Sequence, residues 1–84
     1  MMGGNMSDTI EVDATGLFCP APILKARQKL EAMSEGQKLI LKATDTACAY
    51  AVPNFCAQSG HTLAAKRQIG KLQIFEIIRG AIEN

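Results

Sequence analysis

The 84-residue sequence has few of the residues that nucleic-acid sites and membrane segments require. It contains no Trp, one Tyr and three Phe, so a platform for stacking bases is poorly supplied. Nine Lys and Arg against eight Asp and Glu leave a net charge of +1, without the basic excess that phosphate binding requires. No run of 18 apolar residues occurs. We therefore expect neither direct nucleic-acid binding nor a membrane span.

Metal-binding and disulfide patterns are also missing. The cysteines are odd in number and form no C-x-x-C pair, which argues against a disulfide framework; they are Cys19, Cys48 and Cys56. His61 is the only histidine, whereas a structural zinc site needs four ligands at workable spacings. No nucleotide or flavin motif occurs. We therefore expect no metal and no cofactor.

The first eight residues have neither a basic flank nor an apolar stretch, so they do not resemble a signal peptide. Met2, rather than a glycine, follows the initiator, which argues against myristoylation. We expect residues 1–8 to be a flexible terminus and residues 9–84 to form a single domain, because a chain of this length supports one modest core. The expected location is the cytoplasm, where thiols stay reduced.

The remaining sequence alternates between strand and helix patterns. Strands are predicted at 9–13, 38–43, 62–68 and 72–79, and helices at about 20–33 and within 47–59. The last two strands are close enough in sequence to form a hairpin. The order βαβαββ predicts a two-layer α/β sandwich, with two helices packed on one face of a four-stranded mixed sheet.

Particular residues set the predicted bounds of the helices. One apolar stripe along the first helix consists of Ile23, Ala26, Leu30 and Met33. Gly36 is the expected left-handed cap of this helix. Because Pro53 would interrupt a helix interior, we predict a short turn and then a helix that starts near residue 52 or 53 and ends at Gly60.

The segment from Gly16 to Ile23 carries the chemistry. With Cys19 at the N-cap, Pro20 falls at the first helical position, where proline is favoured. Pro20 and Pro22 have no N–H, so the N–H of Ala21 is the expected donor to the Cys19 sulfur. This bond and the positive end of the helix dipole favour the thiolate, which is the form that attacks sulfur.

Two further features of this turn follow from the same placement. Phe18 and Ile23 would form a hydrophobic staple across the helix start. Pro22 occupies the position of the resolving cysteine in a C-x-x-C motif, so single-thiol chemistry is predicted rather than dithiol chemistry. The alternative is that Cys19 is a small buried apolar residue in a turn shaped by prolines.

Residues 13–22, DATGLFCPAP, resemble the Asp-x-x-Gly-x-x-Cys-Pro-x-Pro signature of the TusA/SirA family of sulfur-carrier proteins. Residues 52–56, followed by Gly60 and His61, resemble its second signature, and the likeness extends from about residue 10 to residue 79. It implies the same βαβαββ sandwich. It also implies that Cys19 takes a sulfane sulfur as a persulfide from a donor such as a cysteine desulfurase or rhodanese and passes it to an acceptor protein. Routes served by the family include 2-thiouridine formation in tRNA and sulfur oxidation.

The sequence departs from the family pattern at several positions. Phe18 and Ala21 stand where many members have charged or larger residues. Asp45 and Thr46 replace the usual Asp-Pro, and Cys48 is not a family residue. These differences bear on the choice of partner rather than on the thiol chemistry.

Residues around the motif are expected either to shape the loop that carries the thiol or to contact a partner protein. Asp13 and Gly16 are expected to shape the loop before the thiol, where Gly16 allows a positive φ. The first helix has a basic outer side that suits an acidic partner docking beside Cys19, together with Phe18; its residues are Lys25, Arg27 and Lys29.

Three residues in the second half of the sequence, one histidine and two cysteines, could in principle take part in the chemistry, but a structural placement is expected for each. We expect His61 to be a hydrogen-bonded structural residue and Cys56 to be packed in its helix. Cys48 would be exposed near the start of that segment.

Three functions are considered for a sequence with these features. The first is a sulfur carrier that works through a persulfide on Cys19. The second is a non-catalytic regulatory or interaction domain in which Cys19 is structural. The third is an RNA-binding module, which the flat charge balance and the scarcity of aromatic residues disfavour.

Overall fold

A computed structural model describes residues 9–81, and the segment 1–8, for which flexibility is predicted, lies outside the described residues. The elements follow in the order β1 (Thr9–Ala14), α1 (Ala21–Ala32), β2 (Lys38–Ala43), α2 (Cys48–Ser59), β3 (Thr62–Ile69) and β4 (Leu72–Ile78). The predicted order βαβαββ is confirmed, and each strand boundary lies within one residue of its predicted position.

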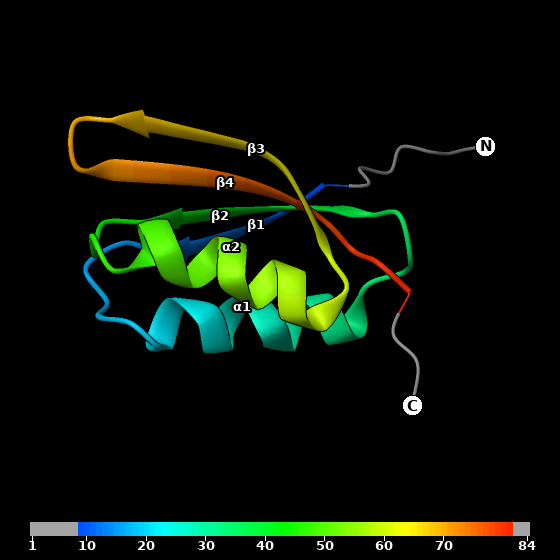
Figure 1. Cartoon of the computed structure of the whole chain (residues 1–84). Coiled ribbons are helices and arrows are strands. Elements are labelled where there is room, and N and C mark those ends of the chain that lie inside the picture. Colours follow the sequence, from blue (N-terminus) through cyan, green and yellow to red (C-terminus); the bar gives the residue numbers. More distant parts are fainter. Residues whose placement is uncertain (1–8, 82–84) are drawn as a thin grey trace.

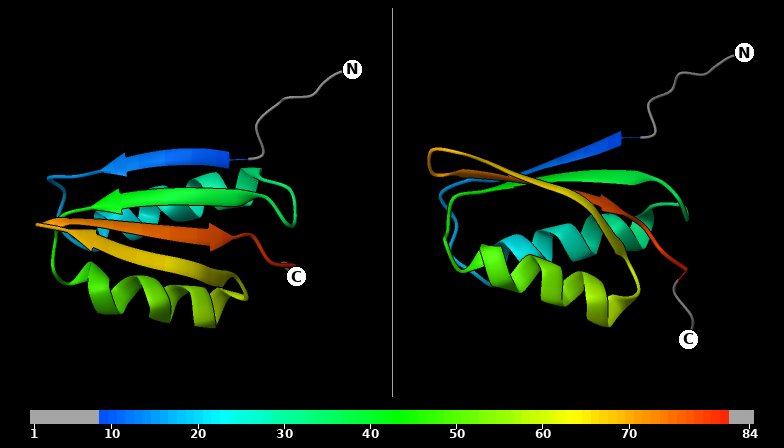
Figure 2. Two further views of the ribbon diagram at one scale, coloured as in Figure 1. Left: turned by 90° about the horizontal axis from the view of Figure 1, so that it is seen from above. Right: turned by 45° about the horizontal axis from the view of Figure 1, so that its top comes forward.

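The four strands form one mixed sheet in the order β1-β2-β4-β3. β1 pairs with β2 in parallel, while β4 is antiparallel to both β2 and β3. Both helices lie on the same face of this sheet, as Figure 1 and the two views of Figure 2 show. The predicted two-layer sandwich is therefore confirmed. Because β1 and β2 are parallel, the loops that follow them emerge at the same edge, and the β3–β4 turn lies there as well.

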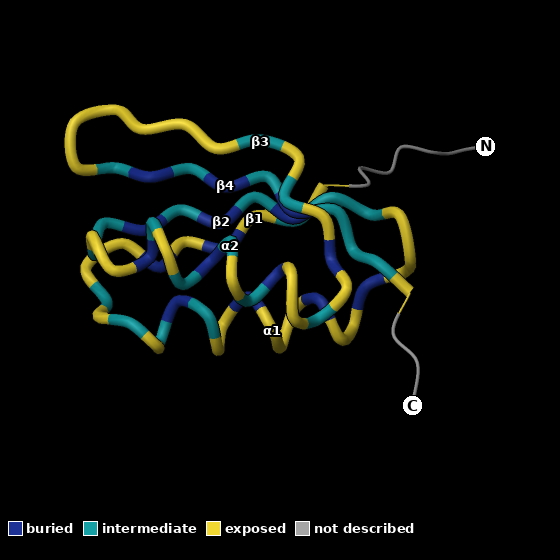
Figure 3. The backbone as a smooth tube through the Cα atoms, viewed as in Figure 1, coloured by how far each residue is buried: buried dark blue, intermediate teal, exposed yellow. Residues whose placement is uncertain are grey.

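The core lies between the sheet and the helices (Figure 3). Alternate residues of β2 and β4 face the helices and are buried; they are Leu39, Leu41, Ala43, Gln73, Phe75 and Ile77. The apolar stripe predicted for α1 is confirmed, because Ala26, Leu30 and Met33 are buried and Ile23 packs against the same cluster. This apolar burial, worth about 1.5–3 kcal/mol for each large side chain, holds both helices on the sheet.

The second helix differs from its prediction. α2 is continuous from Cys48 to Ser59, with Pro53 inside it. Proline removes one backbone hydrogen bond from a helix, but the buried residues Cys48, Val52 and Cys56 are spaced by four and form one stripe against the core. Packing on both sides of Pro53 therefore maintains the first turn that proline was expected to exclude. Gly60 ends the helix in the left-handed conformation, as predicted.

The start and end of α1 also require correction. Pro20, not Cys19, is the N-cap residue, because Pro20 has φ −96° and ψ 12°, outside the helical region. The helix ends at Ala32, and the next residue, Met33, is the C-cap residue and has an extended backbone. Gly36 does have a positive φ of 91°, but it lies beyond Met33 in the turn before β2, so it is not the helix cap.

Candidate functional site

Cys19 lies in the loop between β1 and α1, at the edge of the sheet where β1 ends. Its side chain is half-buried and packs against the core. The preceding residue, Phe18, is 81% exposed. The thiol is therefore supported from one side by the core, and an exposed aromatic side chain precedes it in the loop.

The backbone donor predicted for the Cys19 sulfur has a different partner. The N–H of Ala21 donates to the carbonyl of Phe18 at 2.9 Å, which closes a tight turn around Cys19 and Pro20. The predicted staple is also wrong, because Phe18 is exposed while Ile23 packs against the core. Both corrections follow from the helix starting one residue later than predicted, since Ala21 then continues a turn instead of capping the thiol.

Two hydrogen bonds join this loop to the loop that follows β2. The N–H of Gly16, with φ 82°, donates to Oγ1 of Thr44 at 2.9 Å. The N–H of Cys19 donates to Oδ2 of Asp45 at 2.7 Å. Because the two parallel strands end side by side, these short bonds fix the loop carrying the thiol against its neighbour.

Asp45 is a positioning residue that the sequence analysis did not identify as part of the site. Its Oδ1 accepts the N–H of Ala47 at 3.1 Å while Oδ2 holds Cys19. The bonds from Cys19 and then from Ala47 lower the pKa of the Asp45 carboxyl. The buried amide of Gln73 donates to the Asp45 carbonyl at 2.7 Å, so the loop is also anchored to β4. The only sequence signal was an aspartate that follows β2 and precedes a helix.

Cys48 is completely buried, so the expectation that it is exposed is wrong. Its N–H donates to the carbonyl of Asp45 at 3.0 Å. Burial raises the pKa of the Cys48 thiol to about 12, and a negative charge on Cys19, a hydrogen bond with Cys19 and the Asp45 carboxylate act in the same direction. The two thiols are therefore neighbours, although 29 positions separate them in the sequence.

Cys56 is packed in α2 as predicted, and only 2% of it is exposed. Burial raises the pKa of its thiol to about 11. Because α2 is continuous, the eight residues from Cys48 to Cys56 correspond to about 12 Å along the helix axis, too far for a disulfide. All three cysteines are free.

Asp13, another predicted site residue, lies at the start of the thiol loop. Asp13 accepts both the N–H and the hydroxyl of Thr15, at 3.0 and 2.7 Å. These two bonds, the hydroxyl first, lower the pKa of Asp13, and the charges of Lys42 and Lys25 add to the effect. Asp13 thus closes a local turn at the start of the loop.

The basic residues of α1, Lys25, Arg27 and Lys29, are all exposed. Arg27 is paired with Glu31 at 3.5 Å, one turn along the helix. Lys25 is close enough to the thiol loop to act electrostatically on Asp13. The basic face is therefore uneven, with Lys25 nearest the loop and Arg27 partly neutralised.

A hollow of about 370 Å³ opens beside the thiol loop. It is formed by the thiol loop, the loop after β2 and the β3–β4 turn, and its lining residues are Phe18, Thr44, Asp45, Thr46, Gln68, Gly70 and Lys71. The edge of the sheet that holds Cys19 therefore combines a half-buried thiol, an exposed aromatic ring and an open depression.

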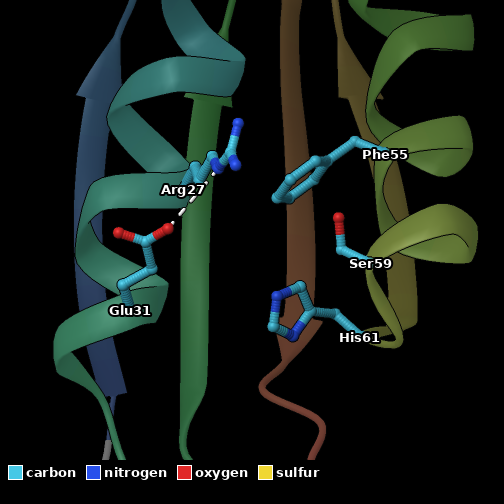
Figure 4. A pocket seen from close by; sticks show the side chains of 5 residues that line it. All are labelled: Arg27, Glu31, Phe55, Ser59 and His61. Atoms are coloured by element: carbon cyan, nitrogen blue, oxygen red, sulfur yellow. Dashed lines mark ion pairs between the residues drawn. The ribbon is translucent and has the colours of Figure 1, made fainter. Parts of the chain in front are cut away.

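A second hollow, of about 190 Å³, lies between α1 and α2 (Figure 4). His61 borders it and accepts the N–H of Gly80 at Nδ1, at 3.0 Å, so the predicted structural role of His61 is confirmed. Within residues 9–81, no group of three or more His, Cys, Asp or Glu side chains is arranged to hold a metal ion. Neither helix in this part of the chain is long and apolar enough to cross a membrane.

Comparison with known proteins matches residues 10–79 to the family described as sulfurtransferase TusA. A protein of Pseudomonas syringae pv. syringae named sulfur carrier protein TusA is 38% identical over 63 residues, which are 75% of this chain and 75% of the relative. A protein of Allochromatium vinosum with the same name is 43% identical over 60 residues, or 71% of this chain and 79% of the relative.

Proposed function

Because the chain belongs to the TusA family of sulfur carriers, we propose that it accepts a sulfane sulfur as a persulfide on Cys19 and passes it to an acceptor protein. The observation that supports this most directly is the placement of Cys19. The thiol lies within the matched span, at the edge of the sheet, half-buried and held through its own backbone N–H. A thiol that only filled the core would need neither this edge position nor this tether.

Loading is a thiolate exchange that needs no external oxidant. The Cys19 thiolate attacks the outer sulfur of a persulfide on the donor protein. A new S–S bond forms between Cys19 and that sulfur, the donor's own S–S bond breaks, and the donor cysteine leaves as a thiolate. Delivery is the same step in reverse, because the acceptor thiolate takes the outer sulfur and Cys19 leaves as the thiolate.

The donor is proposed to be a cysteine desulfurase or a rhodanese, and the relay to serve tRNA thiolation or sulfur metabolism. This makes the protein a sulfurtransferase of the carrier type. We place the relay in the cytoplasm, where thiols stay reduced. The exchange uses protein thiols alone and calls for no cofactor.

The proposed docking surface consists of Phe18, Lys25, Arg27 and Lys29. Phe18 offers an apolar anchor beside the hollow, and an exposed aromatic side chain at the rim of a depression is a common feature of interfaces. Of the basic residues of α1, Lys25 lies nearest the thiol loop, so an acidic partner would be steered toward Cys19.

Mass spectrometry of the intact protein tests the proposal. After incubation with a cysteine desulfurase and cysteine, the wild type should gain about 32 Da for each sulfur bound, and an acceptor thiol should remove it. Cys19→Ser should fold but gain nothing, since serine cannot hold a sulfane sulfur. Cys56→Ser is the matched control and should load normally, because Cys56 is buried about two turns along α2 from Cys48, the thiol that interacts with Cys19.

Two outcomes would contradict the proposal. One is sulfur transfer by Cys19→Ser at the wild-type rate. The other is a wild type that never carries transferable sulfur while Cys19→Ser melts at a clearly lower temperature. That second result would support a non-catalytic interaction domain in which Cys19 is structural.

A further inference from the structure

The backbone around Cys19 leaves few donors for its sulfur. The N–H of Cys19 is bonded to Asp45, and the N–H of Ala21 is bonded to Phe18. Pro20 and Pro22 have no N–H to offer. Of the backbone groups from Cys19 to Pro22, two N–H groups are therefore engaged and the two prolines supply none.

A side chain at the start of α2 lies beside Cys19. Cys48 begins α2, is fully buried and makes a side-chain hydrogen bond with Cys19. Its position is fixed, because its N–H is bonded to the Asp45 carbonyl, and that same carbonyl is held by Gln73 from β4. Asp45 thus binds the main chain of Cys19 through its carboxylate and the main chain of Cys48 through its carbonyl.

We propose that Cys48 is a positioning residue for sulfur transfer, with a buried thiol that donates a hydrogen bond to the Cys19 sulfur and so favours and orients the Cys19 thiolate. The inference rests on the proposed function. In that function Cys19 is a thiolate twice, first when it attacks the donor persulfide and again when it leaves after delivery. A donor that favours the thiolate serves both steps.

The burial that places Cys48 beside Cys19 also keeps it protonated. Its thiol pKa of about 12 leaves almost no thiolate near neutral pH, and a negative charge on Cys19 or Asp45 acts in the same direction as burial. A Cys48 thiolate would attack the inner sulfur of the loaded persulfide, form a Cys19–Cys48 disulfide and release the outer sulfur as hydrosulfide. The protonated thiol donates a hydrogen bond without making this attack, so the sulfur is kept for the acceptor.

The test is the alkylation rate of the unloaded Cys19 thiol by iodoacetamide, followed by peptide mass across neutral pH. Cys48→Ala removes the donor and should slow alkylation at about pH 7 by about three- to tenfold, moving the pH profile toward higher pH. Cys48→Ser keeps an O–H donor of similar size and should stay close to the wild type. Cys56→Ala removes a buried thiol from the same helix, about two turns beyond Cys48, and should change nothing. Melting curves of all variants show that each is folded.

Three results would overturn the inference. The first is wild-type alkylation in Cys48→Ala, and the second is a loss in Cys48→Ser as large as that in Cys48→Ala. The third is a disulfide between Cys19 and Cys48, seen as a loss of about 2 Da with release of sulfide after loading. Because alkylation is measured without sulfur, failure of loading in the wild type would refute only the carrier function.

Discussion

At the scale of single residues, the arrangement around Cys19 depends on one carboxylate. The two oxygens of Asp45 accept separate N–H groups, one from Cys19 and one from Ala47. An asparagine could accept only one of them, and its NH₂ group would face the other N–H. Asp45 therefore joins the thiol loop to the start of α2 in a way that no neutral side chain of the same shape reproduces.

Asp45→Asn should loosen the thiol loop and reduce the rate of persulfide loading by about tenfold or more, because misplacement of a reacting atom slows transfer steeply. The rate of sulfur uptake from a desulfurase, followed by mass, measures this effect. Asp13→Asn is the matched control, since among residues 9–81 the side chain of Asp13 accepts from Thr15 alone, within its own turn. Equal loading rates in the two variants would show that the Asp45 tether is dispensable.

Charge near the thiol should influence partner association. Lys25→Glu is expected to slow sulfur uptake from an acidic donor several-fold at low salt, with a smaller effect as ionic strength rises. Lys66→Glu makes the same change in net charge on the exposed edge strand β3 and should leave uptake unaltered. The readout is the uptake rate of each variant at two salt concentrations, and an effect of equal size in both would assign the result to net charge alone.

At the scale of elements, local patterns predicted most of the fold. The stripe of Ala26, Leu30 and Met33 identified α1, because its spacing already encodes one buried face. Gly60 correctly marked the end of α2, since its left-handed conformation is a local property. The first turn of α2 was missed because packing of Cys48 and Val52 outweighs the local effect of Pro53, and packing is not a local property.

The candidate site was predictable only in part for the same reason. The motif around Cys19 is contiguous and could be read from the sequence. The bond from Cys19 to Asp45 spans 26 positions, and the neighbouring position of Cys48 depends on two parallel strands ending side by side. Neither contact produces a repeating pattern in the sequence from which it could be predicted. The donor assigned to Ala21 was wrong because a shift of one residue in the helix start redirects its N–H.

Pro53 lies inside α2 and lacks the N–H that would complete the backbone hydrogen bonds of this helix. Pro53→Ala restores an N–H inside α2 and should stabilise the protein by about 1–2 kcal/mol, after allowance for the stiffer unfolded chain that proline provides. For a domain of this size, the melting temperature should rise by about 5–10 °C. Pro53→Gly also restores the N–H but should gain less, because glycine disfavours helix by about 1 kcal/mol. A lower melting temperature for Pro53→Ala would mean that the ring's packing matters more than the missing bond.

At the scale of the whole molecule, the end opposite Cys19 is closed by polar bonds. Arg79 donates from Nε to the carbonyl of Leu30 at 2.9 Å, and its main chain exchanges bonds with Gly36 and Gln37. Gly80 donates to His61, and a side chain at Gly80 would overlap the carbonyl oxygen of Gly60. The helices and the sheet are thus tied together where no chemistry is proposed, while the opposite edge carries the thiol and the hollow.

This closed end should make the stability depend on pH through His61. Burial and then the charge of Arg79 lower the pKa of His61 below its ordinary value of 6.5. The unfolded chain therefore binds the proton more readily than the folded one, so the contribution of His61 is complete above about pH 6.5 and is lost as the pH falls through its folded pKa. Protonation also removes the lone pair on Nδ1 that accepts the Gly80 N–H.

Urea unfolding at about pH 7.5 and about pH 5 should show the wild type less stable at the lower pH. His61→Asn keeps an acceptor oxygen for Gly80 but cannot bind a proton in this range, so its stability should change much less between the two conditions. An equal loss in both proteins would place the acid sensitivity between these two pH values in a group other than His61.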